Sequence, residues 1–182
     1  MPRLLEATSS GSGRGLSPVA AGAVVAASVA ATALLGRRNA PEPAHPAIDR
    51  WYRKLRKPSF TPPDPVFGAV WPAVEAALAY GGYRLLRHPP GPARDAGLGL
   101  WLLNTGMIGG WTELFFRRRR VGAGAAAAAA MLAGGAGYVA AAAKVDKAAA
   151  AAGVPFVAWL GFATLLAEEV WRRNSPRGDR LG

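Results

Sequence analysis

The chain has 182 residues, of which 51% are hydrophobic and 18% are charged. This length suits one domain, and the charged fraction lies below the roughly 25% of a typical soluble domain. The net charge of +11 would suit a nucleic-acid-binding protein, but the basic residues lie between and beside long apolar runs. That is the distribution of membrane-protein loops, so we expect a membrane protein and no nucleic-acid partner.

Reactive residue types are scarce in this sequence. The chain has no cysteine, which excludes disulfides, thiolate catalysis and cysteine-based metal sites. Its two histidines, His45 and His88, fall in separate connections, so we expect no metal site and no cofactor. The sequence shows no nucleophile–base pair and no phosphate-binding loop, which indicates that the protein is not an enzyme.

Five apolar segments approach the length of about 20 residues that crosses a bilayer as a helix. These segments are residues 16–35, 67–86, 96–116, 121–143 and 148–171. They predict an all-α fold, namely a polytopic membrane protein with a bundle of five transmembrane helices. The fourth segment is mostly alanine and glycine, so it needs neighbouring helices packed closely against it. The predicted domain covers residues 16–174, between a disordered tail at 1–15 and a basic tail at 175–182.

The first segment has an alternative interpretation as a cleavable signal. Arg3 and Arg14 precede it, and small residues such as Ala31 and Ala33 could imitate a cleavage site. It is longer than the apolar region of a usual signal peptide, so we favour a retained helix.

The basic residues of the connections predict an orientation. When the connections are assigned to alternate sides of the membrane, 15 of the 22 Lys and Arg residues fall on one side and 7 on the other. The positive-inside rule then places the C-terminus and the long first connection in the cytoplasm. The split supports five helices, because four would divide the basic clusters between the two sides.

The first connection, residues 36–66, is too long and too patterned for a simple linker. Trp51, Tyr52 and Phe60 suit the level of the lipid headgroups. Its prolines fix φ and disfavour helix in the residues before them. We interpret it as an ordered loop that caps one end of the bundle; the alternative is an interfacial segment without a ligand role.

Three blocks between Trp51 and Asn174 carry a resemblance to a known family. The first block contains Trp51-Tyr52, Leu55, Lys57-Pro58-Ser59-Phe60, Pro62-Pro63 and Val66-Phe67-Gly68-x-Val70-Trp71. The other two are Trp111-x-x-x-Phe115-Phe116, and Pro155-Phe156-x-Ala158-Trp159-Leu160-x-Phe162-Ala163-Thr164-Leu165-Leu166 followed by Trp171-Arg172-x-Asn174. In these blocks the chain resembles the TspO/MBR family, the tryptophan-rich sensory proteins and mitochondrial translocator proteins.

The resemblance implies five helices, commonly a homodimer, and a pocket inside each bundle that the first connection closes. It implies binding of tetrapyrroles such as protoporphyrin IX or of sterol-like ligands such as cholesterol, with transport proposed for the family. For some members it also implies light-dependent degradation of porphyrin. The implied location is a bacterial membrane or the mitochondrial outer membrane.

This sequence departs from the family pattern at several pocket positions. Ile108 stands near the second block where the family usually has asparagine, and Ala167 stands where the family usually has another. Glu168 replaces an aromatic residue, and Glu75 replaces a tyrosine. These departures leave open whether this protein shares the usual ligand preference of the family, but they do not affect the expected fold.

Helical spacing independently predicts an aromatic slot inside the bundle. Three stripes and one residue of the first connection supply its expected ligand-binding residues: Trp51, Phe67, Trp71, Glu75, Asn104, Ile108, Trp111, Phe115, Trp159, Phe162, Ala163 and Leu166. Such a slot suits a flat apolar ligand held by dispersion and offset stacking. The alternative is lipid-facing or interfacial tryptophan, which we expect for Trp101 and Trp171.

The acids of the apolar segments need partners, because charge at bilayer depth is costly. Glu75 lies one turn after Trp71 and is the best candidate for a polar contact with ligand. We expect Glu113 to pair with Arg117 at i+4. We expect Glu168 and Glu169 to form structural ion pairs with Arg172 and Arg173.

Two glycines, Gly106 and Gly110, form a small-xxx-small motif on the third segment, away from the predicted pocket stripe. The motif fits a close helix contact and makes these residues the candidate dimer interface.

The sequence is compatible with three functions. The first is binding, with or without transport, of porphyrin-like or sterol-like molecules. The second is light-dependent degradation of porphyrin, and the third is a regulatory or scaffolding role with an altered pocket that no longer binds tetrapyrrole.

Overall fold

The computed structural model describes residues 13–175, and every regular element in that range is helical. The elements follow one another in this order: α1 (Pro18–Asn39), α2 (Pro46–Lys54), α3 (Asp64–Arg87), α4 (Pro92–Thr112), the π-helical turn η1 (Glu113–Arg117), α5 (Val121–Ala143) and α6 (Lys147–Asn174). Nearly all of the two predicted tails, 1–15 and 175–182, lies outside the described residues.

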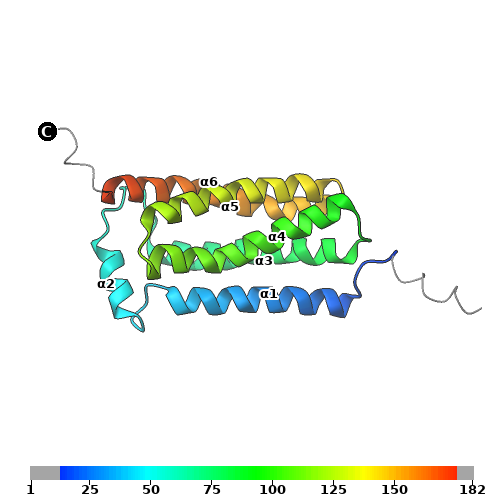
Figure 1. The fold of residues 1–182 in the computed structure, drawn as a ribbon, viewed down its shortest axis with the longest axis horizontal. Coiled ribbons are helices and arrows are strands. Elements are labelled where there is room, and N and C mark those ends of the chain that lie inside the picture. The colour runs from blue at the N-terminus through cyan, green and yellow to red at the C-terminus, as the bar shows by residue number, and fades with distance from the viewer. Residues whose placement is uncertain (1–12, 176–182) are drawn as a thin grey trace, which may run out of the picture.

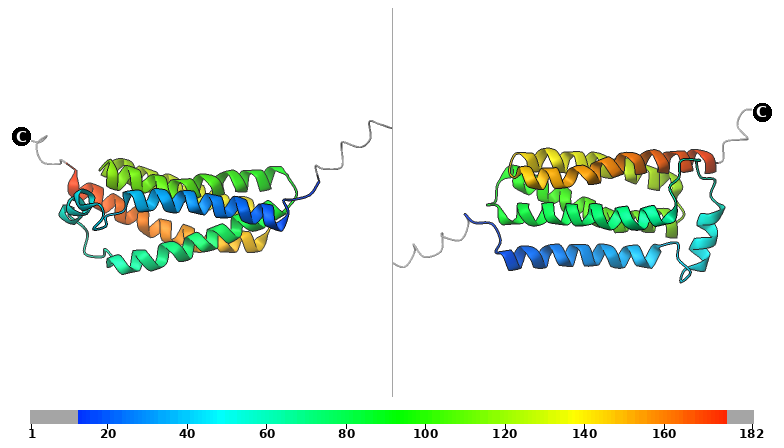
Figure 2. Two further views of the ribbon diagram at one scale, coloured as in Figure 1. Left: turned by 90° about the horizontal axis from the view of Figure 1, so that it is seen from below. Right: turned by 180° about the vertical axis from the view of Figure 1, so that it is seen from behind.

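The five long helices lie side by side along one axis, and α2 lies across one end of them (Figures 1 and 2). Their positions match the five predicted apolar segments, so the prediction of an all-α membrane bundle is confirmed. Among the described helices, α1, α5 and α6 are long and apolar enough to cross a membrane, with mean hydropathies of 2.0, 1.5 and 1.8. That α3 and α4 also cross the bilayer stays a prediction.

Local sequence signals set where the helices begin. The Ser17 hydroxyl accepts a hydrogen bond from the backbone N–H of Ala20 and thereby caps α1. Several helices have a proline in their first turn, where the missing N–H costs no helical bond. Asp146 caps α6 by accepting hydrogen bonds from the backbone N–H groups of Ala148 and Ala149, at 2.9 and 3.0 Å.

The first connection contains helix α2, which the proline argument did not predict. Pro46 occupies the start of this helix, where proline is tolerated, and the prolines from Pro58 onward follow its end. The connection does close one end of the bundle, with α2 running from the α1 side to the α6 side (Figure 2, right). We call residues 40–63 the cap, and we call the opposite end of the bundle the far end.

At the far end the helices pack closely and form a solid end of the bundle, because glycines there leave room for aromatic rings. Trp101 is completely buried, and its indole N–H donates to the backbone carbonyl of Leu78 at 3.0 Å. A Cβ atom on Gly82 would lie 2.2 Å from the Trp101 ring, so only glycine fits. The prediction that Trp101 faces lipid is therefore wrong, and a partner on another helix, which helical spacing cannot show, is the reason.

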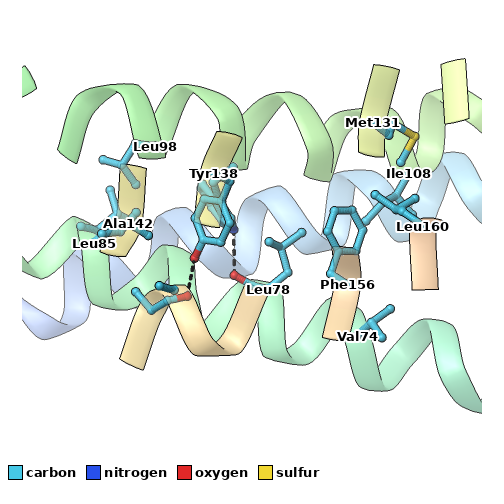
Figure 3. Packing of buried hydrophobic residues seen from close by; sticks show 14 of the residues in the cluster. Val74, Leu78, Leu85, Leu98, Ile108, Met131, Tyr138, Ala142, Phe156 and Leu160 are labelled. Carbon is cyan, nitrogen blue, oxygen red and sulfur yellow. Dashed lines mark hydrogen bonds between the residues drawn. The ribbon is translucent and has the colours of Figure 1, made fainter. Parts of the chain in front are cut away.

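Tyr138 closes the same region from α5. It is fully buried, and its hydroxyl donates to the carbonyl of Ala149 at 3.1 Å (Figure 3). Gly81 and Gly153 leave room for the ring, since a Cβ on either would overlap it. Close approach of small residues is how membrane helices pack when lipid provides no hydrophobic drive.

Asp146, in the connection before α6, ties the far end together. Its second carboxylate oxygen receives hydrogen bonds from Arg84 at 2.8 Å and His88 at 2.9 Å. Burial alone would raise the pKa of this carboxyl group, but the Ala149 N–H, His88 and Arg84 outweigh it and hold the pKa well below its usual value. The carboxylate is thus the ionised form that the fold stabilises.

Candidate ligand-binding cavity

A cavity of about 560 Å³ lies between the cap and the helix ends beneath it. Its lining comes from the cap, α1, α3, the α4–η1 segment, α5 and α6. The volume falls within the range of roughly 300–1,000 Å³ that holds small-molecule ligands. Most of the exposed lining is apolar, so the cavity suits a hydrophobic body.

One wall is a cluster of aromatic rings at the end of α4. Trp111 stacks on Phe115 with ring centroids 4.6 Å apart and an angle of 13° between the planes. Phe116 meets Trp111 edge-on at 5.5 Å. The Trp111 indole N–H donates to the carbonyl of Gly124 on α5 at 2.8 Å, which fixes the ring against the cavity.

Two consecutive phenylalanines of the π-helical turn η1 line this wall. Phe115 and Phe116 both lie within Glu113–Arg117, and both line the cavity. Single π-helical turns inside α-helices occur frequently at functional sites.

Trp71 and Phe67 of α3 form the opposite wall, and a second aromatic layer supports them from α6. Trp159 meets Phe67 at 5.8 Å and Trp71 at 6.2 Å, both edge-on. Phe162 lies 5.3 Å from Trp159 and contacts Phe60 of the cap at 6.3 Å. Trp159 and Phe162 do not line the cavity themselves, so they position the wall.

Pro72 shapes this wall as well. It lies inside α3 and has no backbone N–H, so the carbonyl of Gly68 lacks its usual i+4 donor. Gly68 lines the cavity, and α3 diverges from its neighbours toward the cap end (Figure 2, left). Proline inside a helix commonly causes a bend, and the divergence of α3 widens the bundle where the cavity lies.

Charged residues surround the mouth of the cavity under the cap. Asp49 and Arg53 form an ion pair at 3.0 Å, and Lys57 lies 3.5 Å from the centre of the Tyr52 ring. Burial lowers the pKa of Lys57; burial and the nearby Asp64 raise the pKa of the Tyr52 hydroxyl, which therefore stays neutral. The mouth offers groups of both signs, in contrast to the apolar interior.

Further contacts hold the cap in place besides that of Phe60 with Phe162. Trp51 meets Phe115 edge-on at 5.9 Å, and Tyr52 meets Phe116 at 5.4 Å. At the other edge, the Asn174 side chain accepts a hydrogen bond from the Arg56 N–H and donates one to the Arg56 carbonyl, both at 3.0 Å. We call this pair of hydrogen bonds the clasp.

The structure brings most of the predicted site residues together. Eight of the twelve line the cavity: Phe67, Trp71, Glu75, Ile108, Trp111, Phe115, Ala163 and Leu166. Trp51 and Trp159 contact the lining residues Phe115 and Phe67, and Phe162 contacts Trp159. Asn104 does not line it; that placement was wrong, because its side-chain amide donates to the Leu100 carbonyl and faces Gly134 of α5.

Other lining residues escaped the sequence analysis. Thr32 and Gly36 of α1 and Met131 of α5 line the cavity, but no spacing pattern in those apolar helices marks them. Thr32 is a single polar residue facing the interior, and that was the one available signal. Tyr52 and Lys57 were visible as part of the first sequence block.

The remaining acids behave in different ways. Glu113 pairs with Arg118 at 3.2 Å and more loosely with Arg117 at 3.9 Å. Glu169 pairs with both Arg172 and Arg173 at 3.2 Å. Glu168 is exposed and has no ion pair among the described residues, so the expected pairing holds only for its neighbour.

Gly106 and Gly110 do not take part in close helix packing within the protomer. A Cβ on Gly106 would meet nothing within 4 Å, and one on Gly110 would meet only Met107 of the same helix. Their role in a dimer stays a prediction.

These features define an all-helical integral membrane protein with an aromatic cavity closed by its own first connection. A model of the TspO/MBR family matches residues 21–172, and the chain belongs to this family. The resemblance carried by the three sequence blocks is thereby confirmed.

Individual relatives support the same assignment. The chain is 34% identical over 134 residues to the translocator protein of Homo sapiens, which covers 72% of this chain and 79% of that protein. It is 33% identical over 136 residues to the translocator protein of Ovis aries, covering 72% and 80%. It is 26% identical over 129 residues to Protein CrtK of Rhodobacter capsulatus, covering 68% and 78%.

Proposed function

We propose that this protein binds a flat apolar ligand of the porphyrin or sterol type in the cavity under the cap. The supporting observation is a space of about 560 Å³ with Trp71 on one side and Trp111 stacked on Phe115 on the other. Aromatic walls favour a flat ligand through offset stacking and dispersion. The ligand's polar edge faces the charged mouth, where Arg53 and Lys57 can meet carboxylates.

Replacement of the family's usual asparagines changes the polarity of the interior. Ile108 and Ala167 both line the cavity and both present hydrocarbon. The walls thus hold the ligand by shape and apolar contact, with few hydrogen bonds to fix its orientation. This favours ligands with an extended hydrophobic body.

Tryptophan fluorescence tests the proposal directly. We expect protoporphyrin IX to quench the purified protein saturably at micromolar concentration. The Trp71→Ala variant removes a cavity wall and should weaken binding several-fold, and Trp159→Ala should weaken it less, because Trp159 only supports that wall. Trp171→Phe is the matched control, since Trp171 is 41% exposed and does not line the cavity.

The proposal would be contradicted if neither protoporphyrin IX nor haem quenched the tryptophan fluorescence saturably and cholesterol also failed to bind. It would favour the regulatory or scaffolding alternative. Light-dependent degradation is distinguished by illumination of the bound complex: a new product absorbance that requires Trp71 and Trp111 would establish it. Transport is a separate measurement, namely ligand movement across vesicles that contain the protein.

We further propose a homodimer through Gly106 and Gly110, and a cytoplasmic C-terminus in a bacterial or mitochondrial outer membrane. The open surface around Gly106 supports a close partner helix. Gly106→Leu should shift the protein from dimer to monomer in cross-linking and light-scattering measurements. Accessibility of an engineered cysteine after residue 175 to a membrane-impermeant reagent tests the orientation.

A further inference from the structure

Glu75 occupies a distinctive position at the inner end of the cavity. Its side chain lines the large cavity and also a small neighbouring one of about 10 Å³. Thr32 and Ile108 line both spaces with it. The small space has room for about one water molecule, so Glu75 lies between the ligand space and a small, mostly apolar recess that two threonines also line.

Glu75 has no partner within the described part of the protein. It forms none of the ion pairs or side-chain hydrogen bonds found between residues 13 and 175. The basic residues that line the cavity, Arg53 and Lys57, belong to the cap at its other end. A carboxyl group at bilayer depth without a partner is costly, whether charged or neutral.

The recess beside Glu75 contains a second unpartnered group. Thr105 is 6% exposed, and its buried hydroxyl has no hydrogen-bond partner. The neighbouring Thr32 hydroxyl is occupied, because it donates to the Thr105 carbonyl at 2.6 Å. The half-buried carboxyl group of Glu75 and the buried hydroxyl of Thr105 thus line the same small recess, and neither has a hydrogen-bond partner among the described residues.

We propose that Glu75 is a specificity-determining residue that recognises a hydrogen-bond donor, a hydroxyl or a protonated amine, at the inner end of an apolar ligand. This inference rests on the proposed ligand-binding function. The donor reaches the Glu75 carboxyl group directly or through a water in the recess beside Thr105. Because Glu75 is itself an acid, the inner end disfavours a carboxylate of the ligand. A ligand carboxylate must therefore lie at the mouth of the cavity.

Four probes with the same flat body test this assignment: methylpyrene, pyrenemethanol, pyrenemethylamine and pyrenecarboxylic acid. Binding is followed by energy transfer from tryptophan to pyrene in the full-length protein in detergent. Pyrenemethanol and pyrenemethylamine should bind about tenfold more tightly than methylpyrene, which is the size of one hydrogen bond to a charged or strongly polar group. Pyrenecarboxylic acid should gain nothing from Glu75, because its carboxylate must lie at the mouth, so its affinity should not fall when Glu75 is replaced.

Substitutions of the acid should change the order of the probes. Glu75→Leu should abolish the preference for the two donor probes and leave methylpyrene bound at least as tightly as before. Glu75→Gln keeps the size of the side chain. This variant should bind pyrenemethanol as tightly as the wild-type protein does, but its affinity for pyrenemethylamine should be about tenfold lower. Glu168→Leu is the matched control, because Glu168 is exposed on α6 and should change none of the four affinities.

The outcomes separate this inference from the proposed function. If no probe binds saturably, the ligand-binding function itself fails. If all bind but methylpyrene equals the donor probes in the wild-type protein, or if Glu75→Gln leaves every ratio unchanged, the cavity binds ligands and the role of Glu75 is overturned. The wild-type series and the Gln variant decide the question even if Glu75→Leu fails to fold.

Discussion

The two tryptophans of α4 experience opposite environments ten residues apart. Trp101 at the far end is completely buried, with its ring against Gly82 and its N–H bonded to a neighbouring helix. Trp111 at the cap end stacks on Phe115 and faces a cavity. Both indoles donate to a carbonyl of a neighbouring helix, and a glycine makes room for an aromatic ring at each end, Gly82 for Trp101 and Gly124 for Phe115. The difference is that Trp101 is enclosed on all sides, whereas Trp111 keeps one side on the cavity. One bundle thereby contains a solid end and a hollow end.

The largest expected effect comes from filling the space beside Trp101. The added Cβ of Gly82→Ala would lie 2.2 Å from the ring, so the ring must move and its hydrogen bond to Leu78 must weaken. We expect a loss of about 3 kcal/mol of stability, despite the better helix propensity of alanine. Thermal unfolding in detergent measures it.

Gly68→Ala is the matched control on the same helix at the hollow end. A Cβ there would meet nothing within 4 Å, so stability should stay the same or rise slightly. Equal destabilisation by the two alanines would contradict the contrast between the ends.

Asp146→Asn should produce the next largest loss, about 2 kcal/mol at neutral pH, because it weakens a helix cap and two partly exposed charge contacts. Since the folded-state pKa lies below the ordinary value of 3.8, the stabilisation is full above that pH and lost as the pH falls below it. Unfolding measured from pH 6 to pH 3 should show a decline in the wild-type protein that the Asn variant lacks. A parallel decline in both would assign the acid sensitivity to other groups.

Trp111→Ala addresses the hollow end. Loss of the stacked ring removes one face of the cavity, and we expect protoporphyrin IX to bind about tenfold more weakly. Quenching titrations compare the affinity of Trp111→Ala with that of the control variant Trp171→Ala, since Trp171 does not line the cavity. If the control loses as much affinity as the test variant, the ligand binds elsewhere.

The smallest expected effect concerns the clasp. Asn174→Ala removes both hydrogen bonds to Arg56, and we expect bound ligand to leave about fivefold faster, equivalent to about 1 kcal/mol, with little change in unfolding. Arg56→Ala is a strict control, because the clasp uses only the backbone of Arg56. Stopped-flow release of a pyrene probe measures the rates; identical rates would show that the aromatic contacts alone hold the cap.

The sequence predicted the features that depend on local spacing and length. Apolar length placed the five long helices, and the i, i+4 stripes placed Trp71 and Trp111 at the cavity. The features it missed depend on partners distant in the chain. Burial of Trp101 requires Gly82 on α3, and the clasp joins positions separated by 118 residues.

Two further misses have causes that spacing rules do not include. Asn104 shares a stripe with Ile108 at i+4, yet it turns toward α5, because Gly134 gives its amide a place to lie. Phe116 was not assigned to the wall, because a regular helix would direct it away from the side that Phe115 occupies. It lies in the π-helical turn η1 and lines the cavity together with Phe115.

The solid far end limits how a molecule can move through this protein. A route along the axis would require the Trp101 indole to move away from Gly82 and Tyr138 to lose its hydrogen bond to the Ala149 carbonyl. Both steps would break contacts that hold the helices together. A ligand of the proposed kind would therefore enter and leave the cavity past the cap or laterally between the helices, and not along the axis of the bundle.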